Sequence, residues 1–215
     1  ADIPIAQKDA TNPGWWQPGV DHYTIDIAQF EDQLHPDLPN PTRLWGFGQG
    51  PTNTFRHLGG IIAAKKDTPV QITFRNNLPP THIMPVDDTI MGVMGNQMNR
   101  ADIHLHGGHV PWISDGGPHA WWDPDGHKGV SFLNNQVLRP GQLVPNNEAE
   151  YYYPNDQGSR LAWYHDHSFG ITRINAYAGI ASGYVIYDDY ELELVAANHM
   201  PGPLDPRTVY LVFQD

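Results

Sequence analysis

Leu161-Ala162-Trp163-Tyr164-His165-Asp166-His167 is a seven-residue stretch in which apolar and histidine side chains occupy every second position. This alternation is typical of a β-strand, because successive side chains point to opposite faces of a sheet. His165 and His167 therefore share a face and lie roughly 6–7 Å apart along the strand. Asp166 has the opposite parity, so we expect it to point away from the imidazoles and to hold an imidazole or a backbone amide from behind.

A second histidine pair with the same spacing occurs earlier, in His104-Leu105-His106-Gly107-Gly108. Two such strands can present four imidazoles to one pocket, and neutral imidazole is a good ligand for copper, zinc and iron. A single pair is compatible with ordinary polar side chains near a surface. Two pairs, each at a predicted strand end and each followed by a glycine-containing loop, instead predict a metal site. A single-metal zinc site normally adds only one further ligand to such a pair, so the second full pair favours more than one metal ion.

The rest of the chain shows the same period of two and little helical periodicity. Alternating apolar residues predict strands within residues 22–27, 70–74, 102–106 and 209–213, and residues 179–187 have the composition of a largely buried strand. The 21 glycines and 20 prolines suit turns and disfavour helices. We therefore predict an all-β sandwich or barrel with two long loops, over residues 80–100 and 107–147.

The two long loops hold further residues that could bind a soft metal ion. Four methionines lie in the first loop, and three histidines lie in the second: Met84, Met91, Met94 and Met98, and His109, His119 and His127. Thioethers bind copper(I), but loop methionines are more often apolar filler or part of a flexible lid. For the histidines, solvated side chains are the preferred interpretation over an auxiliary metal site.

The composition excludes several classes of function. Hydrophobic residues make up 40% of the 215 residues, which is enough for a packed core. The net charge of −12 comes without a basic stripe, so nucleic acid is not an expected partner. No apolar run approaches the roughly 20 residues of a membrane span. The chain has no cysteine, which excludes disulfides, thiol nucleophiles and thiolate metal ligands.

The sequence pattern changes after residue 190. Residues 191–207 include the run Ala-Ala-Asn-His-Met-Pro-Gly-Pro-Leu-Asp-Pro, and proline-rich segments of this kind are typical of an extended linker. Residues 208–215 then have the pattern of a new strand, which needs a partner strand. We therefore predict one domain over residues 1–190, a linker over 191–207, and the first strand of a second domain over 208–215.

Several blocks of the sequence together resemble one known family. They are Thr42-Arg43-Leu44-Trp45-Gly46, Asn76-Asn77-Leu78-Pro79, the first histidine motif with Ser114-Asp115-Gly116, the second histidine motif with Thr172-Arg173, Asn175 and Tyr177-Ala178-Gly179, and Phe213-Gln214-Asp215. These blocks resemble the N-terminal cupredoxin domain of three-domain multicopper oxidases, in particular the group of spore-coat laccases, phenoxazinone synthases and bilirubin oxidases. The resemblance spans most of the chain from residue 42 onward. It implies a cupredoxin-like Greek-key β-sandwich or barrel.

The resemblance also implies roles for five residues. In that family the leading histidine of the first motif binds a type 2 copper, and the other three histidines bind type 3 coppers. His104 is then a type 2 ligand, and His106, His165 and His167 are type 3 ligands. Asp115 matches an acid that, in the family, assists proton transfer and orients solvent near the type 2 copper. Ser-Asp-Gly is also ordinary turn chemistry, so a plain turn acid remains the alternative for Asp115.

The family further requires groups that this chain lacks. A type 1 copper is held by two histidines and a cysteine, and further histidine motifs complete the trinuclear cluster. The resemblance implies an oxidase that takes single electrons from a small reducing substrate and reduces dioxygen to water. This chain would be inactive alone and would need the remainder of the oxidase, in the same polypeptide or as a separate chain. We expect a secreted, periplasmic or cell-surface location. Two alternatives stay open: a copper-binding structural module without oxidase activity, and a single-metal zinc or iron enzyme on a β-sandwich.

Overall fold

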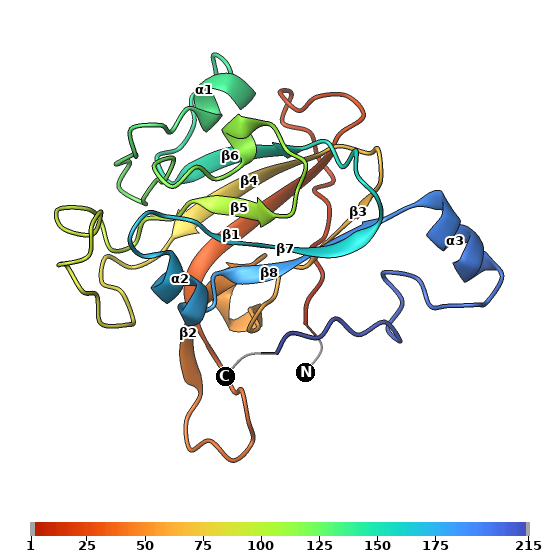
Figure 1. Ribbon diagram of the computed structural model, residues 1–215, viewed down its shortest axis with the longest axis horizontal. Helices are drawn as coiled ribbons and strands as arrows, with labels where there is room; N and C mark the ends of the chain where they lie inside the picture. The colour runs from red at the N-terminus through yellow and green to blue at the C-terminus, as the bar shows by residue number, and fades with distance from the viewer. Residues whose placement is uncertain (1–2, 214–215) are drawn as a thin grey trace.

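Two four-stranded sheets form the body of the protein in a computed structural model that describes residues 3–213 (Figure 1). One sheet has the order β2-β1-β4-β6 and the other has the order β3-β8-β7-β5. The strands are β1 (Asp21–Asp32), β2 (Thr42–Gly48), β3 (Ile62–Lys65), β4 (Val70–Asn77), β5 (Ile103–His106), β6 (Glu148–Tyr153), β7 (Arg160–Asp166) and β8 (Ala181–Tyr187). Helical segments are short: α1 (Asn134–Leu138), α2 (Thr172–Ala178), α3 (Asp189–Ala196) and two 3-10 turns, Thr52–Thr54 and Trp112–Ser114. The all-β prediction is confirmed.

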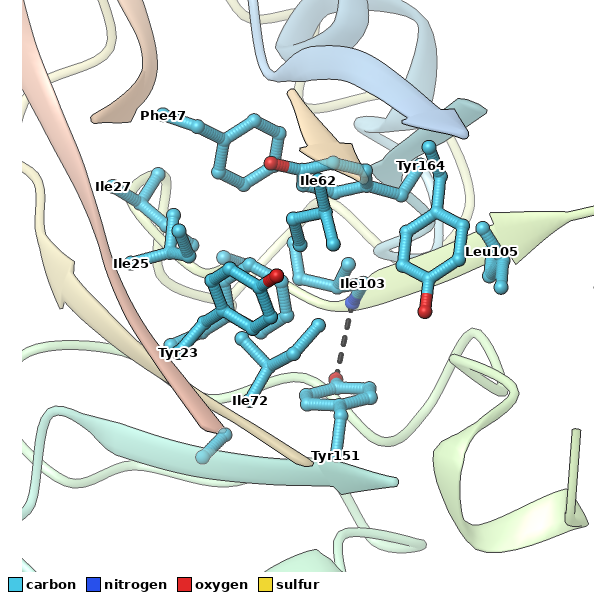
Figure 2. Close-up of a cluster of buried hydrophobic side chains, with 14 of the residues drawn as sticks. Tyr23, Ile25, Ile27, Phe47, Ile62, Ile72, Ile103, Leu105, Tyr151 and Tyr164 are labelled. Carbon is cyan, nitrogen blue, oxygen red and sulfur yellow. Dashed lines mark hydrogen bonds between the residues drawn. The ribbon is translucent and has the colours of Figure 1, made fainter. Parts of the chain in front are cut away.

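The core lies between the two sheets and follows from the alternation in the strands. Tyr23, Ile25 and Ile27 of β1 all point inward and are at most 1% exposed. They meet side chains of the second sheet, among which are Ile103 and Leu105 of β5 and Tyr164 of β7 (Figure 2). Burying apolar side chains of this size stabilises the fold by about 1.5–3 kcal/mol each.

A hydrogen bond between β5 and β6 joins the two sheets across the core. The backbone N–H of Ile103 donates to the hydroxyl oxygen of Tyr151 over 3.1 Å (Figure 2). Tyr151 belongs to β6 and is fully buried. Because a buried hydroxyl is costly unless it is paired, this bond fixes the position of β5 relative to the first sheet.

The segment after residue 188 differs from the sequence prediction. Residues 191–207 were expected to be an extended linker, but α3 covers Asp189–Ala196. The Asp188 carboxylate caps this helix by accepting from the Glu191 N–H at 2.9 Å, and the run of Glu, Leu and Ala residues favours a helix. The strand expected over 208–215 is not formed by residues 208–213, and residues 214 and 215 lie outside the described part. The proposed division into domains stays a prediction.

None of the helices described over residues 3–213 combines the length and the apolar character that crossing a bilayer requires.

Candidate metal centre

The two histidine motifs lie side by side in the second sheet. Strands β5 and β7 pair antiparallel, and the register sets His104 opposite His165. Leu105 and Tyr164, the inward neighbours, are buried in the core. Since side chains alternate along each strand, the histidines must therefore point to the outer face of the sheet. The predicted convergence of the two motifs is confirmed.

The four rings form one cluster. The ring centroid of His104 lies 5.6 Å from that of His106, 5.5 Å from that of His165 and 4.9 Å from that of His167. One ring nitrogen each of His104, His106 and His165 lies within 4.8 Å of the others. Distances of this size are compatible with metal ions held between the rings, and the number of ions stays a prediction.

Backbone carbonyls fix the orientation of two of the rings. The Nδ1 atom of His104 lies 2.6 Å from the carbonyl oxygen of Asp115, and Nδ1 of His165 lies 2.7 Å from that of Asp166. In each ring this bond puts the proton on Nδ1 and leaves the Nε2 lone pair free for a metal ion. The Nε2 atom of His165 is 3.3 Å from Nδ1 of His106, so these two nitrogens converge on the same space.

The electrostatic environment favours the neutral form of two of the imidazoles, His165 and His167. Burial, with smaller contributions from the neighbouring His104, His167 and His106, lowers the pKa of His165 to about 4. Burial and the proximity of His104 also lower the pKa of His167. A metal ligand must be unprotonated, so the folded chain offers these rings in the binding form at neutral pH. The four imidazoles, with no thiolate, suit copper, zinc or iron, and a cluster of copper ions fits the donor set.

Asp115 lies beside the His104 ring, and its role in proton transfer stays a prediction. Its carboxylate oxygen Oδ1 is 3.3 Å from Nδ1 of His104, and its side chain is 53% exposed. The residue ends a 3-10 turn, which agrees with its turn chemistry as well. The carboxylate thus stands between the cluster and solvent, at the ring predicted to bind the type 2 copper.

A pair of buried carboxylates, Asp102 and Asp166, lies behind the cluster. The sequence predicts only the orientation of Asp166. Asp166 points away from the rings, as predicted, and accepts from the N–H groups of Asp102 and Ser168, both at 3.0 Å. Asp102 in turn accepts from the Tyr151 hydroxyl at 3.1 Å. Burial raises the pKa of Asp166 to about 6, and burial together with the charge of Asp166 raises that of Asp102 well above its ordinary value. Only the antiparallel pairing, which no local pattern encodes, brings the two acids together.

Trp163 lies outside the core, on the outer face of the sheet beside the histidines. Its side chain is 43% exposed. Its ring stacks on His165 at 4.2 Å and on His106 at 5.1 Å, with interplanar angles of 27° and 26°. Tyr164, by contrast, is buried in the core. The indole therefore forms a wall of the cluster instead of part of the core.

The loop residues singled out as possible metal ligands lie apart from the cluster. His109 pairs with Asp156 at 2.8 Å, and His127 pairs with Asp123 at 2.7 Å. Asp123 also accepts two backbone N–H groups of its own turn, so its carboxylate is already satisfied. Met91 and Met94 are largely exposed, at 79% and 76%.

Comparisons with known proteins connect this geometry to a family. No protein-family model matches the chain. A laccase of Bacillus subtilis is 36% identical over 179 residues, which cover 80% of this chain and 30% of the laccase. A laccase of Bacillus stratosphericus is 34% identical and covers 90% of this chain and 34% of its own length. The chain belongs to the multicopper oxidase family.

The fold comparison agrees with the sequence comparison. The crystal structure of a multicopper oxidase from Pediococcus acidilactici superposes with a TM-score of 0.58 at 19% identity, over 90% of this chain and 30% of that oxidase. The predicted cupredoxin-like fold is thereby confirmed. The chain spans about 30–34% of the length of these curated relatives, and it is a partial multicopper oxidase.

Proposed function

We propose that this chain supplies one wall of a trinuclear copper site in a laccase-like oxidase. In this proposal His104 binds the type 2 copper, and His106, His165 and His167 bind the two type 3 coppers. The observation that supports it most strongly is the convergence of all four rings, with Nε2 of His104 and His165 left unprotonated by their Nδ1 bonds to carbonyls. When bound, the copper ions would supply the redox chemistry that reduces dioxygen to water with electrons from a small reducing substrate.

The residues of the chain would orient and protect this site. The Asp115 and Asp166 carbonyls hold the rings of His104 and His165 in one tautomer. Trp163 covers one side of His165 and His106 and limits the approach of water. The Asp115 carboxylate, half-exposed and 3.3 Å from the His104 ring, is placed to pass protons between solvent and the site.

The open side of the cluster supports a partner that completes it. His106 is exposed, so the described residues leave this side of the rings open to solvent. Next to it lies a groove of about 420 Å³ lined by apolar side chains, among them Ile61, Leu161 and Trp163. Apolar surface of this kind marks an interaction site. We propose that the remaining cupredoxin domains of the same oxidase pack here and bring the other ligands and the type 1 copper.

The domain limits and location form part of the same proposal. Residues 1–190 would be the first domain, 191–207 the connection through α3, and the chain from residue 208 onward the beginning of the second. The complete oxidase would be secreted, periplasmic or at the cell surface. The absence of cysteine in these 215 residues suits an oxidising compartment, in which free thiols do not persist.

The test is His165→Ala in the complete oxidase. Because His165 is the most buried ligand, its loss should remove copper from the site and lower oxygen uptake at least about 100-fold. His109→Ala is the matched control, since that histidine pairs with an acid in a loop. Copper content by elemental analysis and oxygen uptake are the measurements. Unchanged copper and activity in His165→Ala would refute the proposal, and zinc or iron in place of copper would favour the single-metal alternative.

A further inference from the structure

His167 is the ligand whose position depends most on loops. His104, His106 and His165 lie within strands β5 and β7, but β7 ends at Asp166. The backbone N–H of His167 donates to the carbonyl of Asp102 at 2.7 Å, and the chain then turns away toward α2. Together with this bond, the contacts that hold residues 168–170 therefore set where the His167 ring can lie.

Arg100 is hydrogen-bonded to this segment from within the protein. Its side chain is fully buried, and one of its guanidinium nitrogens donates to the carbonyl of Phe169 at 2.7 Å. The same guanidinium donates to the carbonyls of Gly92 at 3.1 Å and Gln97 at 2.5 Å. One side chain thus joins the loop before β5 to the backbone two residues after His167.

Packing around Phe169 makes this connection tight. Gly92 lies so close that a Cβ on it would collide with the Phe169 ring, and the Phe169 N–H donates to the Pro118 carbonyl at 3.0 Å. The Phe169 ring also contacts the His119 ring, with centroids 4.9 Å apart. The segment after His167 is therefore held by both long loops, and Arg100 is the polar side chain at their junction.

The chemistry of Arg100 suits a positioning role. A guanidinium presents several N–H donors in a fixed planar fork, whereas an ammonium cannot span three carbonyls at these positions. A buried cation is costly, and its cost is reduced here by the three carbonyls and by the negative charge of the nearby Asp166. Removing the fork would leave carbonyls unpaired and free the Phe169 backbone to shift.

We infer that Arg100 is a positioning residue for His167, which it holds in place through the carbonyl of Phe169 so that the ring stays beside His104. This inference rests on the proposed copper site. It adds a role for the loop over residues 80–100, whose backbone becomes part of the support of a metal ligand.

The experiment compares Arg100→Lys with Arg139→Lys in the complete oxidase. Arg139 is also a buried arginine, but it pairs with Glu148 on the other sheet. Copper(II) retention against a chelator of known affinity should fall about 10–100-fold in Arg100→Lys and stay at the wild-type level in Arg139→Lys. In the metal-free 215-residue chain, the NMR signals of the His167 ring should move or broaden in Arg100→Lys, while those of His106 stay in place.

Two results would overturn the inference. One is copper retention in Arg100→Lys equal to that in Arg139→Lys at comparable thermal midpoints, and the other is an unchanged His167 ring signal. If Arg100→Lys does not fold, Gly92→Ala is the second test. Its added methyl group, on the loop over residues 80–100, would push against the Phe169 ring and displace it. Retention at the wild-type level in that variant would also contradict the inference. Loss of copper in His165→Ala together with full retention in Arg100→Lys would reject only the role of Arg100.

Discussion

Two buried histidines on opposite sheets have opposite surroundings. His22 on β1 is 3% exposed and His165 on β7 is 6% exposed. Both ring nitrogens of His22 face carboxylates, Asp9 at 2.8 Å and Glu150 at 3.3 Å. His165 faces a carbonyl on one side and other imidazoles on the other. Burial alone therefore does not distinguish a structural histidine from a ligand, but the partners of the ring nitrogens do.

The surroundings act on the two protonation equilibria in opposite directions. Burial opposes protonation of His22, but hydrogen bonds and charge from Asp9 and Glu150 outweigh it and raise the pKa. Around His165 burial and three further imidazoles act together and lower it. His22 is thus arranged to carry a proton between two acids, whereas His165 is arranged to give its lone pair to a metal ion.

The largest expected effect is a loss of folding stability when His22 is replaced. His22→Ala leaves the buried Glu150 without its imidazole partner and removes the ring on which Trp16 stacks at 4.0 Å. The free energy of unfolding should fall by about 3 kcal/mol, because breaking a buried polar pair strands its partner. Copper content should stay unchanged. Denaturant unfolding measures the first quantity, with His35→Ala on the exposed β1–β2 connection as control. An unchanged free energy of unfolding in His22→Ala would contradict the structural role of His22.

A second prediction concerns Asp115, whose carboxylate lies beside Nδ1 of the His104 ring. Asp115→Asn keeps the backbone carbonyl that orients His104 and removes only the carboxylate. Oxygen uptake by the complete oxidase should fall about 100-fold with copper content unchanged, if the carboxylate passes protons. Asp156→Asn is the matched control, since Asp156 also pairs with a histidine, at 2.8 Å. Activity at the wild-type level would leave Asp115 as a turn acid.

The third prediction concerns the pKa values of His22 and His165, which one pH titration measures together. In the metal-free 215-residue chain, the His165 ring should titrate near pH 4 and the His22 ring above its ordinary value of about 6.5. Between about pH 6.5 and 4 the unfolded chain binds a proton that folded His165 does not bind. His165 therefore lowers the stability as the pH falls through this window, whereas the contribution of His22 is lost as the pH rises through its raised pKa. NMR of the ring protons measures both, and a His165 midpoint above 6 would contradict the assignment.

The sequence predicts the histidine cluster well because the signal is local. The spacing of His104 and His106, and of His165 and His167, sets both pairs on one face of a strand wherever those strands lie. Asp166 follows from the same parity. The pairing of β5 with β7 is not encoded by spacing, and the two motifs indicate only that such strands could share one pocket.

The supports of the cluster could not be predicted in this way. Arg100 meets Phe169 across 69 positions of sequence, and Asp102 meets Asp166 across 64. The sequence does not predict strand β6, because glutamates such as Glu148 and Glu150 normally face solvent. In the structure both are buried: Glu148 pairs with Arg139, and Glu150 pairs with His22. Helix α3 is not predicted, because the proline-rich run directly after it indicates an extended segment. In each case a tertiary contact or a cap outweighed the local pattern.

The most direct measurement is anomalous diffraction at the copper edge from crystals of the complete oxidase. The proposed function predicts copper peaks within bonding distance of the rings of His104, His106, His165 and His167, and none beside His22. Absence of copper from these four rings, or a copper ion bound between His22 and its two acids, would contradict it.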